Sequence, residues 1–449
     1  MKESDWLHFD IHADYVKELT FQSTIDGQSD LCPEVSWLID LSLRNGQHPG
    51  PFMRRLRTIH CIEADTDYLW IVHPFIGPSL TVFSMKAFQE YDSTDLSFAS
   101  LKLLDVLRIR SPFLQELTIT MPGPQSLDED PRLTAALSRL VCSLKHLRHL
   151  HYDNVNVDLP SLVHLSSLPD LRILGVGIDQ RQVEQMSLLA SSPPPFPKVS
   201  EIAISVNSLA IAVNFVRAWR FKAPTKIVRV CVDSFPSAIS FRAFFEALVE
   251  CDLSKSLCEI DIRHPEDQNF DEPEQNGLHG LAIKSLLVLT NLEVLKINAA
   301  CSTHELDDNL LEEIAAAWPR LRVLQISWSL RTKCHSPKIT LNGLAALAKC
   351  RVLTNLSIAF NSRSPLHRPL NTLPQRNLQS MTFAKSSLKY RAKVIQFFAE
   401  VFPNLSSIDA YNDCGYDPEH IRRQDRRWDQ MKELFRTFAG RDSGVVLAS

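Results

Sequence analysis

The sequence is poor in glycine, in paired cysteines and in long apolar runs, and each shortage argues against a class of protein. Only 13 of 449 residues are glycine, and no phosphate-binding glycine loop occurs, so nucleotide-binding architecture is not expected. The 10 cysteines include no C-x-x-C pair, which argues against a disulfide framework or a structural zinc site. No signal peptide or membrane span is visible, because Asn214 and Arg217 interrupt the longest central apolar run. We therefore expect an intracellular protein, cytoplasmic or nuclear.

The chain also lacks an excess of charge of either sign. Lys and Arg total 48 and Asp and Glu total 52, a formal net charge of -4 at pH 7. No basic field therefore draws the protein to nucleic acid or to an anionic membrane. A chain of 449 residues would ordinarily form two or three domains, but a repeat protein escapes that limit because each unit packs only on its neighbours.

What the chain does contain is a recurrent L-x-x-L-x-L pattern, in which any apolar residue can stand for leucine. At 45% hydrophobic residues, chance alone would supply roughly 40 single matches, so the spacing has to carry the argument. The steps between units average about 29 residues, near or slightly above the usual leucine-rich period. The first positions of the units are Leu56, Leu80, Leu114, Leu147, Leu171, Val199, Ile227, Leu257, Leu292, Leu321, Leu353, Leu378 and Leu405.

Proline and helical segments support the same periodicity. Six units carry proline two residues before their first position, where chance predicts roughly one, and a proline there ends the preceding helix and favours an extended strand. These prolines are Pro78, Pro112, Pro169, Pro197, Pro319 and Pro403. Between the strands, apolar residues recur at intervals of three and four, as in amphipathic helices that pack on a sheet. Such segments are 132–144, 238–251, 309–318, 340–350 and 391–402.

Short strands that alternate with helices predict an α/β leucine-rich-repeat solenoid, a right-handed horseshoe with parallel strands on the concave face and helices on the convex face. We expect irregular N-terminal repeats over residues 1–50, with strands near Val16 and Leu38. The repeat domain should cover 51–415, and a C-terminal capping helix should cover 416–449. Three long segments, 122–131, 191–197 and 264–277, are interpreted as solvated loops on one rim.

The N-terminal segment DWLHFDIHADYVKELTF, with Trp6, Phe9, Val16 and Leu19, and the irregular P-x-L-x-x-L-x-I units resemble the F-box/leucine-rich-repeat proteins abundant in mushroom-type fungi. The resemblance covers essentially the whole chain. In that family an F-box docks on a Skp-type adaptor, and the repeats present a substrate to an SCF-type ubiquitin ligase. Only five residues precede Trp6, so the F-box is expected to be absent. The resemblance therefore implies substrate recognition, while adaptor docking rests on family likeness alone.

No residue pattern indicates an enzyme, a cofactor or a metal site. His149 and His151 share one strand face and, with His146, form the best metal candidate, but no carboxylate or further His ligand is assured beside that pair. Cys231 has no identifiable histidine partner and is interpreted as a structural thiol. The basic run 420–428 is interrupted by Asp425 and is interpreted as a solvated face of the capping helix.

The remaining candidate is the concave face of the predicted sheet. Side chains alternate along a strand, so those between the core positions should line this face. The side chains expected there are Glu116, Thr118, His149, His151, Glu201, Arg229, Glu259, Asp261, Lys296, Gln325, Asn355, Ser357 and Asp409. A mixed polar lining suits recognition of a protein, on the concave face or the loop rim. The leading interpretation is a non-enzymatic scaffold of the substrate-receptor type. Its alternatives are a scaffold independent of any ligase and a nucleic-acid-associated repeat protein, which the net charge disfavours.

Overall fold

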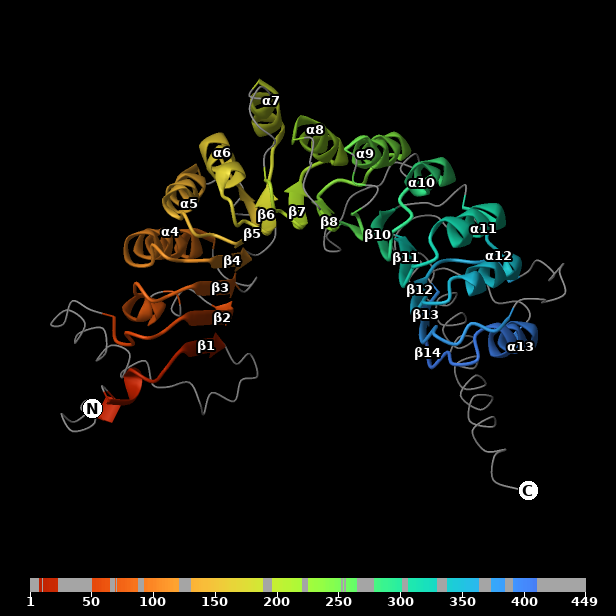
Figure 1. Cartoon of the computed structure of the whole chain (residues 1–449), viewed down its shortest axis with the longest axis horizontal. Helices are drawn as coiled ribbons and strands as arrows, with labels where there is room; N and C mark the ends of the chain where they lie inside the picture. The colour runs from red at the N-terminus through yellow and green to blue at the C-terminus, as the bar shows by residue number, and fades with distance from the viewer. Residues whose placement is uncertain are drawn as a thin grey trace. The chain divides into compact units, whose positions relative to one another are not determined.

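The structure is a computed structural model of the chain, shown in Figure 1. The chain divides into two compact units, residues 1–205 and residues 206–449, here called the first and second units. Among the described residues, no helix is long and apolar enough to cross a membrane. The residues that the structure describes are 8–9, 11–22, 51–64, 69, 71–87, 93–120, 131–188, 196–219, 225–251, 253, 256–264, 278–300, 306–328, 337–362, 373–383 and 391–409.

The first unit is built of parallel strands that follow one another in the sheet in chain order. Each strand pairs with the next one along the chain, from β1 with β2 to β6 with β7. Parallel neighbours need a crossover between them, which explains why strands alternate with helical segments. The strands are β1 (Glu18–Gln22), β2 (Thr58–Ala64), β3 (Val82–Ala87), β4 (Glu116–Thr120), β5 (His149–Asn156), β6 (Ile173–Gly177) and β7 (Glu201–Val206).

The helices of the first unit cover one face of its sheet (Figure 1). Their positions are η1 (His73–Phe75), α4 (Ser93–Arg110), α5 (Pro131–Ser143), α6 (Leu159–Ser167) and α7 (Gln180–Leu188). In α5, Leu133, Leu137 and Leu140 are buried at helical spacing and give the helix an apolar stripe. Helix α6 begins where the Asp158 carboxylate accepts the Ser161 N–H at 3.0 Å.

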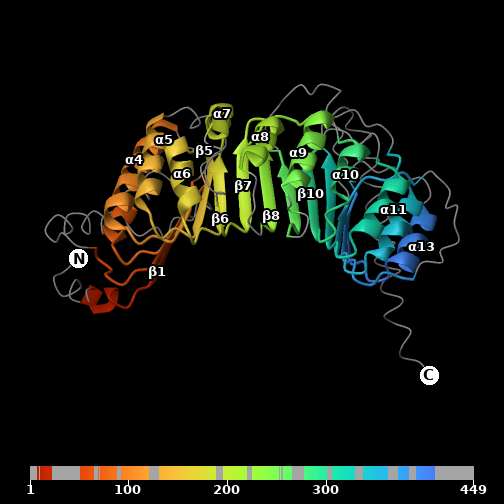
Figure 2. The ribbon, with the colours of Figure 1, turned by 45° about the horizontal axis from the view of Figure 1, so that its top comes forward.

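The second unit repeats this plan, with helices over one face of its parallel strands (Figure 2). Ser237, Asp307 and Thr340 cap α9, α11 and α12 by accepting a backbone N–H. The strands are β8 (Ile227–Val232), β9 (Glu259–Arg263), β10 (Val294–Ala300), β11 (Val323–Trp328), β12 (Asn355–Ser357), β13 (Ser380–Thr382) and β14 (Ser407–Asp409). The helices are α8 (Leu209–Trp219), α9 (Ala238–Glu250), α10 (Gly280–Leu286), α11 (Asp308–Ala317), α12 (Leu341–Ala346), η3 (Leu347–Lys349) and α13 (Arg391–Val401).

One hydrogen-bond pattern joins successive repeats. Two consecutive N–H groups at the start of a strand donate to a single carbonyl of the preceding repeat. Gln115 and Glu116, for example, donate to the Thr81 carbonyl at 2.8 and 3.0 Å. Both units therefore use one repeated junction. The carbonyls that accept in this way belong to Lys17, Arg57, Thr81, Gln115, Arg148 and Arg172 in the first unit, and to Lys226, Cys258, Glu293, Arg322, Thr354 and Gln379 in the second.

The predicted core positions that the structure describes are confirmed in every unit but one, and Ala410 of the last unit lies outside the described residues. Leu114, Leu117 and Ile119 illustrate the rule, since all three predicted core side chains of that unit are buried. The unit predicted to start at Ile227 is out of register by two residues. Thr225, which is fully buried, occupies its first position, and Ile227 is half-buried and pairs with Glu259 instead. A search for apolar residues misses this start because the position is filled by threonine.

The structure tests the prediction for one end of the chain but not for the other. Strand β1 confirms the strand expected near Val16. The strand expected near Leu38, the capping helix over 416–449 and most of the three long loop segments lie outside the described residues. The domain boundaries at residues 50 and 415 stay predictions.

Candidate binding surface on the open face

Each unit has one sheet face turned away from its helices, here called the open face. Along β7 and β8, buried side chains alternate with half-buried ones, and the buried set packs under the helices. The strand registers place the predicted residues in two rows on the open face of each unit. In the first unit, one row holds Glu116, His149 and Glu201, and the other holds Thr118 and His151. In the second unit, one row holds Glu259 and Asn355, and the other holds Arg229, Asp261, Lys296, Gln325, Ser357 and Asp409, the last of these placed by its backbone pairing with Thr382.

A pair of histidines occupies the open face of the first unit. His149 pairs in register with Glu116, and His151 pairs with Thr118. Burial lowers the pKa of His149 below its ordinary value; the nearby carboxylates of Glu116 and Glu201 oppose this shift, and a charge on His151 adds to it. Burial therefore favours the neutral form of His149. No group of three or more His, Cys, Asp or Glu side chains in the described part of the chain is arranged to hold a metal ion.

The ring of His151 lies against Gly175 on the neighbouring strand. A Cβ at Gly175 would collide with the imidazole, lying 2.9 Å from its Cγ and 3.1 Å from the His151 Cα. Glycine at this position therefore lets the imidazole lie close to the backbone of β6. The sequence analysis identified His151 but gave no sign of its contact with Gly175, because that contact depends on cross-strand register.

Carboxylates stand outermost on the first unit's open face. Glu18 of β1 lies 3.8 Å from the His60 imidazole of β2, and the glutamate side chain is 65% exposed against 35% for the histidine. Glu116 is also exposed. A molecule that approaches this face therefore meets carboxylates before histidines.

The open face of the second unit carries a compact charged cluster over β8, β9 and β10. We call it the arginine cluster and define it as Arg229, Glu259, Asp261, Arg263 and Lys296. The Asp261 carboxylate is fully buried and accepts hydrogen bonds from Arg263 Nε at 2.9 and 3.0 Å. Arg229 Nη2 lies 3.1 Å from a Glu259 carboxylate oxygen. In the strand register, Asp261 pairs with Arg229 on one side and Lys296 on the other.

The cluster corrects the expectation for one residue and adds another. Asp261 was expected to line the face, yet it is fully buried and hydrogen-bonded to Arg263, so it orients that guanidinium rather than reaching a partner itself. Arg263 was missed, although its position two residues after Asp261 places both side chains on one face of the strand. The side-chain hydrogen bond from Arg263 to Asp261 also raises the pKa of the guanidinium.

From β11 to β13 the residues in the two open-face rows are uncharged. Gln325 and Asn355 come from β11 and β12, followed by Ser380 and Thr382 on β13. Ser357 was also expected to line this face, but the structure buries it. Cys231, at the end of β8, is half-buried and pairs in register with Arg263. Between β8 and β13, the charged groups of these rows thus lie over the three adjacent strands β8, β9 and β10.

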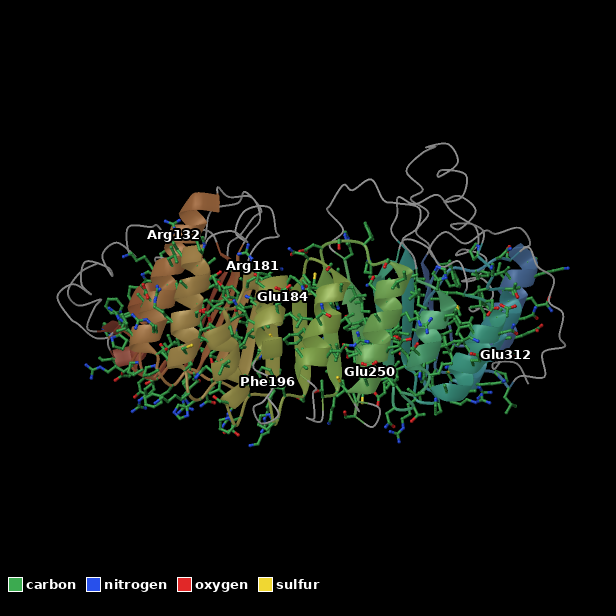
Figure 3. The ribbon with its side chains drawn as sticks, turned by 90° about the horizontal axis from the view of Figure 1, so that it is seen from above. Arg132, Arg181, Glu184, Phe196, Glu250 and Glu312 are labelled. Carbon is green, nitrogen blue, oxygen red and sulfur yellow. The ribbon has the colours of Figure 1, made fainter. Side chains whose placement is uncertain are left out.

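On the helix-covered face, two ion pairs between neighbouring helices expose both signs of charge to a similar extent. Figure 3 labels Glu250 at the end of α9, and Arg217 of α8 lies 3.2 Å from its carboxylate. Lys284 of α10 pairs with Glu313 of α11 at 2.8 Å. In both pairs the cation and the carboxylate are similarly exposed. These ion pairs join neighbouring helices and present both signs of charge together.

No family model matches the sequence, and no curated protein matches it. The argument for function therefore rests on the open face itself.

Proposed function

We propose that the chain is a leucine-rich-repeat solenoid of the horseshoe type, and that it acts as a non-enzymatic scaffold that binds another protein on its open face. The solenoid proposal is supported by the L-x-x-L-x-L units and by the single junction that recurs between repeats. Each repeat contributes one strand and, in most cases, one helix, as the period of such proteins requires.

The observation that carries the binding proposal is the polar open face on a rigid support. Its side chains project from hydrogen-bonded parallel strands, so the backbone that carries them is already ordered before a partner binds. Charged and uncharged polar groups alternate with small or apolar ones such as Gly175 and Val294. A mixed lining of this kind is typical of protein recognition by hydrogen bonds and complementary charge.

By its resemblance to F-box/leucine-rich-repeat proteins, we further propose that the bound protein is a substrate presented to an SCF-type ubiquitin ligase. The test is to isolate the tagged chain from its own cells and to identify the co-purifying proteins by mass spectrometry. A Skp-type adaptor together with a cullin supports the ligase role. A reproducible partner without either of them overturns the ligase role and leaves a scaffold independent of it.

The open face itself is tested with matched variants in the same isolation. The double substitution Glu116→Ala and Lys296→Ala alters the open face, whereas Arg242→Ala and Glu246→Ala remove an ion pair of 2.7 Å on α9, on the helix side. A partner lost from the first variant and retained by the second supports the proposal. A partner retained by the first variant, or lost equally from both, overturns it.

A further inference from the structure

The ion pairs of the arginine cluster are oriented with the carboxylates beneath and the guanidinium groups above. Asp261 is 0% exposed beneath Arg263, which is 58% exposed. Glu259 is 19% exposed beside Arg229, which is 37% exposed. Although the two pairs are formally neutral, the charge that faces solvent is positive, and the negative charge lies against the sheet. The first unit has the opposite order at Glu18 and His60.

The buried carboxylate also fixes the arginine that covers it. Arg263 donates Nε and Nη2 to Asp261, which holds its planar group in one orientation. A guanidinium has five N–H donors, and the Nη1 edge is not used in this interaction. An arginine held in this way has already lost much of its rotamer freedom, so a ligand that binds it pays less to order it.

Lys296 adds a third cation beside the same carboxylate. It pairs in register with Asp261 from β10, as Arg229 does from β8, so cations flank the buried carboxylate on both sides. Neighbouring strands lie about 4.8 Å apart, and Arg229 and Lys296 are therefore separated by about 10 Å along the sheet. Side chains on one side of an extended peptide recur about every 7 Å, so two or three acidic side chains of one segment can reach these cations.

From this geometry we infer that the arginine cluster docks an acidic, extended segment of the protein partner, with aspartate or glutamate side chains on Arg229, Arg263 and Lys296. The inference rests on the proposed protein-binding function and names the chemistry of the partner. The footprint fits a short acidic segment better than nucleic acid, because only three cations are present and two carboxylates lie directly beneath them. A phosphate backbone depends on many cations along its path.

The test measures the binding of fluorescein-labelled 12-residue peptides to the whole chain by fluorescence anisotropy. The peptides are six repeats of Glu-Ser, Gln-Ser or Lys-Ser, and a labelled 12-nucleotide oligodeoxythymidine is the competing anion. Binding of the Glu-Ser peptide above the other two, weakened as sodium chloride is raised, supports the inference. Equal binding of the three peptides, or tighter binding of the oligonucleotide, overturns it.

Variants then locate the site. Lys296→Gln removes the cation of the cluster that has the smallest structural role, and it should weaken the Glu-Ser peptide about threefold. The double variant Asp261→Asn with Arg263→Gln removes cation and buried carboxylate together, which avoids an unpaired buried charge, and should weaken it about tenfold. Arg242→Gln, on the helix side, is the charge-matched control and should leave the affinity unchanged. Equal losses in all three variants overturn the inference.

The two proposals fail in different ways. If the Glu-Ser peptide shows no preference while open-face substitutions still release the cellular partner, the acidic-segment inference is wrong and the scaffold function stands. If the peptide binds at the cluster but open-face substitutions leave the partner bound, the scaffold function on this face is wrong.

Discussion

Gly175 lies directly against the imidazole of His151, at a distance that leaves no room for a Cβ on the glycine. The two residues pair in register across β5 and β6, on the open face of the first unit. The neighbours of the glycine are backbone and ring atoms of a single residue, so the cost of a side chain at this position can be assigned to one contact.

We predict that Gly175→Ala destabilises the first unit by about 1–3 kcal/mol, because the new methyl group must displace the His151 ring. Urea denaturation measures the loss. In the His151→Ala background the same substitution should cost much less, since the imidazole is no longer there. Equal costs in the two backgrounds would show that the collision is not with the ring.

Tyr152→Phe should leave the stability unchanged or raise it by up to about 1 kcal/mol. Tyr152 is fully buried, and its hydroxyl has no hydrogen-bond partner within the described residues, so its removal abolishes a desolvation cost. Burial also raises the pKa of the phenol above its ordinary value. Denaturation curves are compared with those of Tyr15→Phe, an exposed tyrosine where no change is expected. A clear destabilisation specific to Tyr152→Phe would contradict the prediction.

Acid should destabilise the first unit through His73. Burial, with smaller contributions from Arg110 and Lys102, lowers the pKa of His73 to about 4 from an ordinary 6.5. The unfolded chain therefore binds a proton at a pH where the folded protein does not. Stability contributed by the neutral imidazole is present above pH 6.5 and is lost as the pH falls toward 4.

The prediction for His73 is checked by urea denaturation at a series of pH values. His73→Asn should flatten the decline between pH 6.5 and 4 without changing its sign, since His149 has a pKa lowered in the same direction. A profile identical to that of the unaltered protein would contradict the role of His73. Titration of the His73 ring proton by NMR gives its pKa directly.

Thiol labelling should separate the cysteines by burial. Among the cysteines that the structure describes, Cys142 is exposed and should react first with iodoacetamide in the native protein. Cys61 and Cys350 are buried, and burial raises the pKa of their thiols to about 12 and about 11, so little thiolate forms at pH 8. Both should label only when the chain unfolds, as peptide mass spectrometry would report. Rapid native labelling of Cys350 would be inconsistent with its burial.

The repeat units could be predicted from sequence because leucine and its substitutes recur at core positions with little ambiguity. Leu114 and Leu147 each lie two residues before a strand, as their units predict, and the helix expected over 238–251 is α9. The prediction failed at Thr225. This threonine fills a core position and is fully buried, although a search for apolar residues does not find it. Side chains alternate between the two faces of a strand. The two-residue error in the predicted start of this unit therefore still left Arg229 on the open face.

The candidate surface was predictable as a set of residues but not as an arrangement. Alternation along β9 is enough to place Asp261 on the open face. That Asp261 is buried and Arg263 exposed depends on how the two side chains fold over each other. Register across strands, which brings Lys296 beside Asp261, is likewise set by the packing of whole repeats and not by either strand alone. The sign of the charge that faces solvent follows from these two facts.

The shared carbonyl between repeats makes the architecture modular. Each repeat offers the same acceptor to the next, whether it belongs to Thr81, Cys258 or Thr354, and each receives it with the same two N–H groups. The two N–H donors and the acceptor carbonyl are backbone atoms, which almost any residue supplies. At the Arg57, Arg172, Arg322 and Gln379 carbonyls a serine or threonine hydroxyl donates as well. Within either unit, loss or duplication of one whole repeat would leave an acceptor facing a matching pair of donors. The number of repeats can therefore change without loss of this junction, while the open-face side chains of each repeat are substituted one at a time.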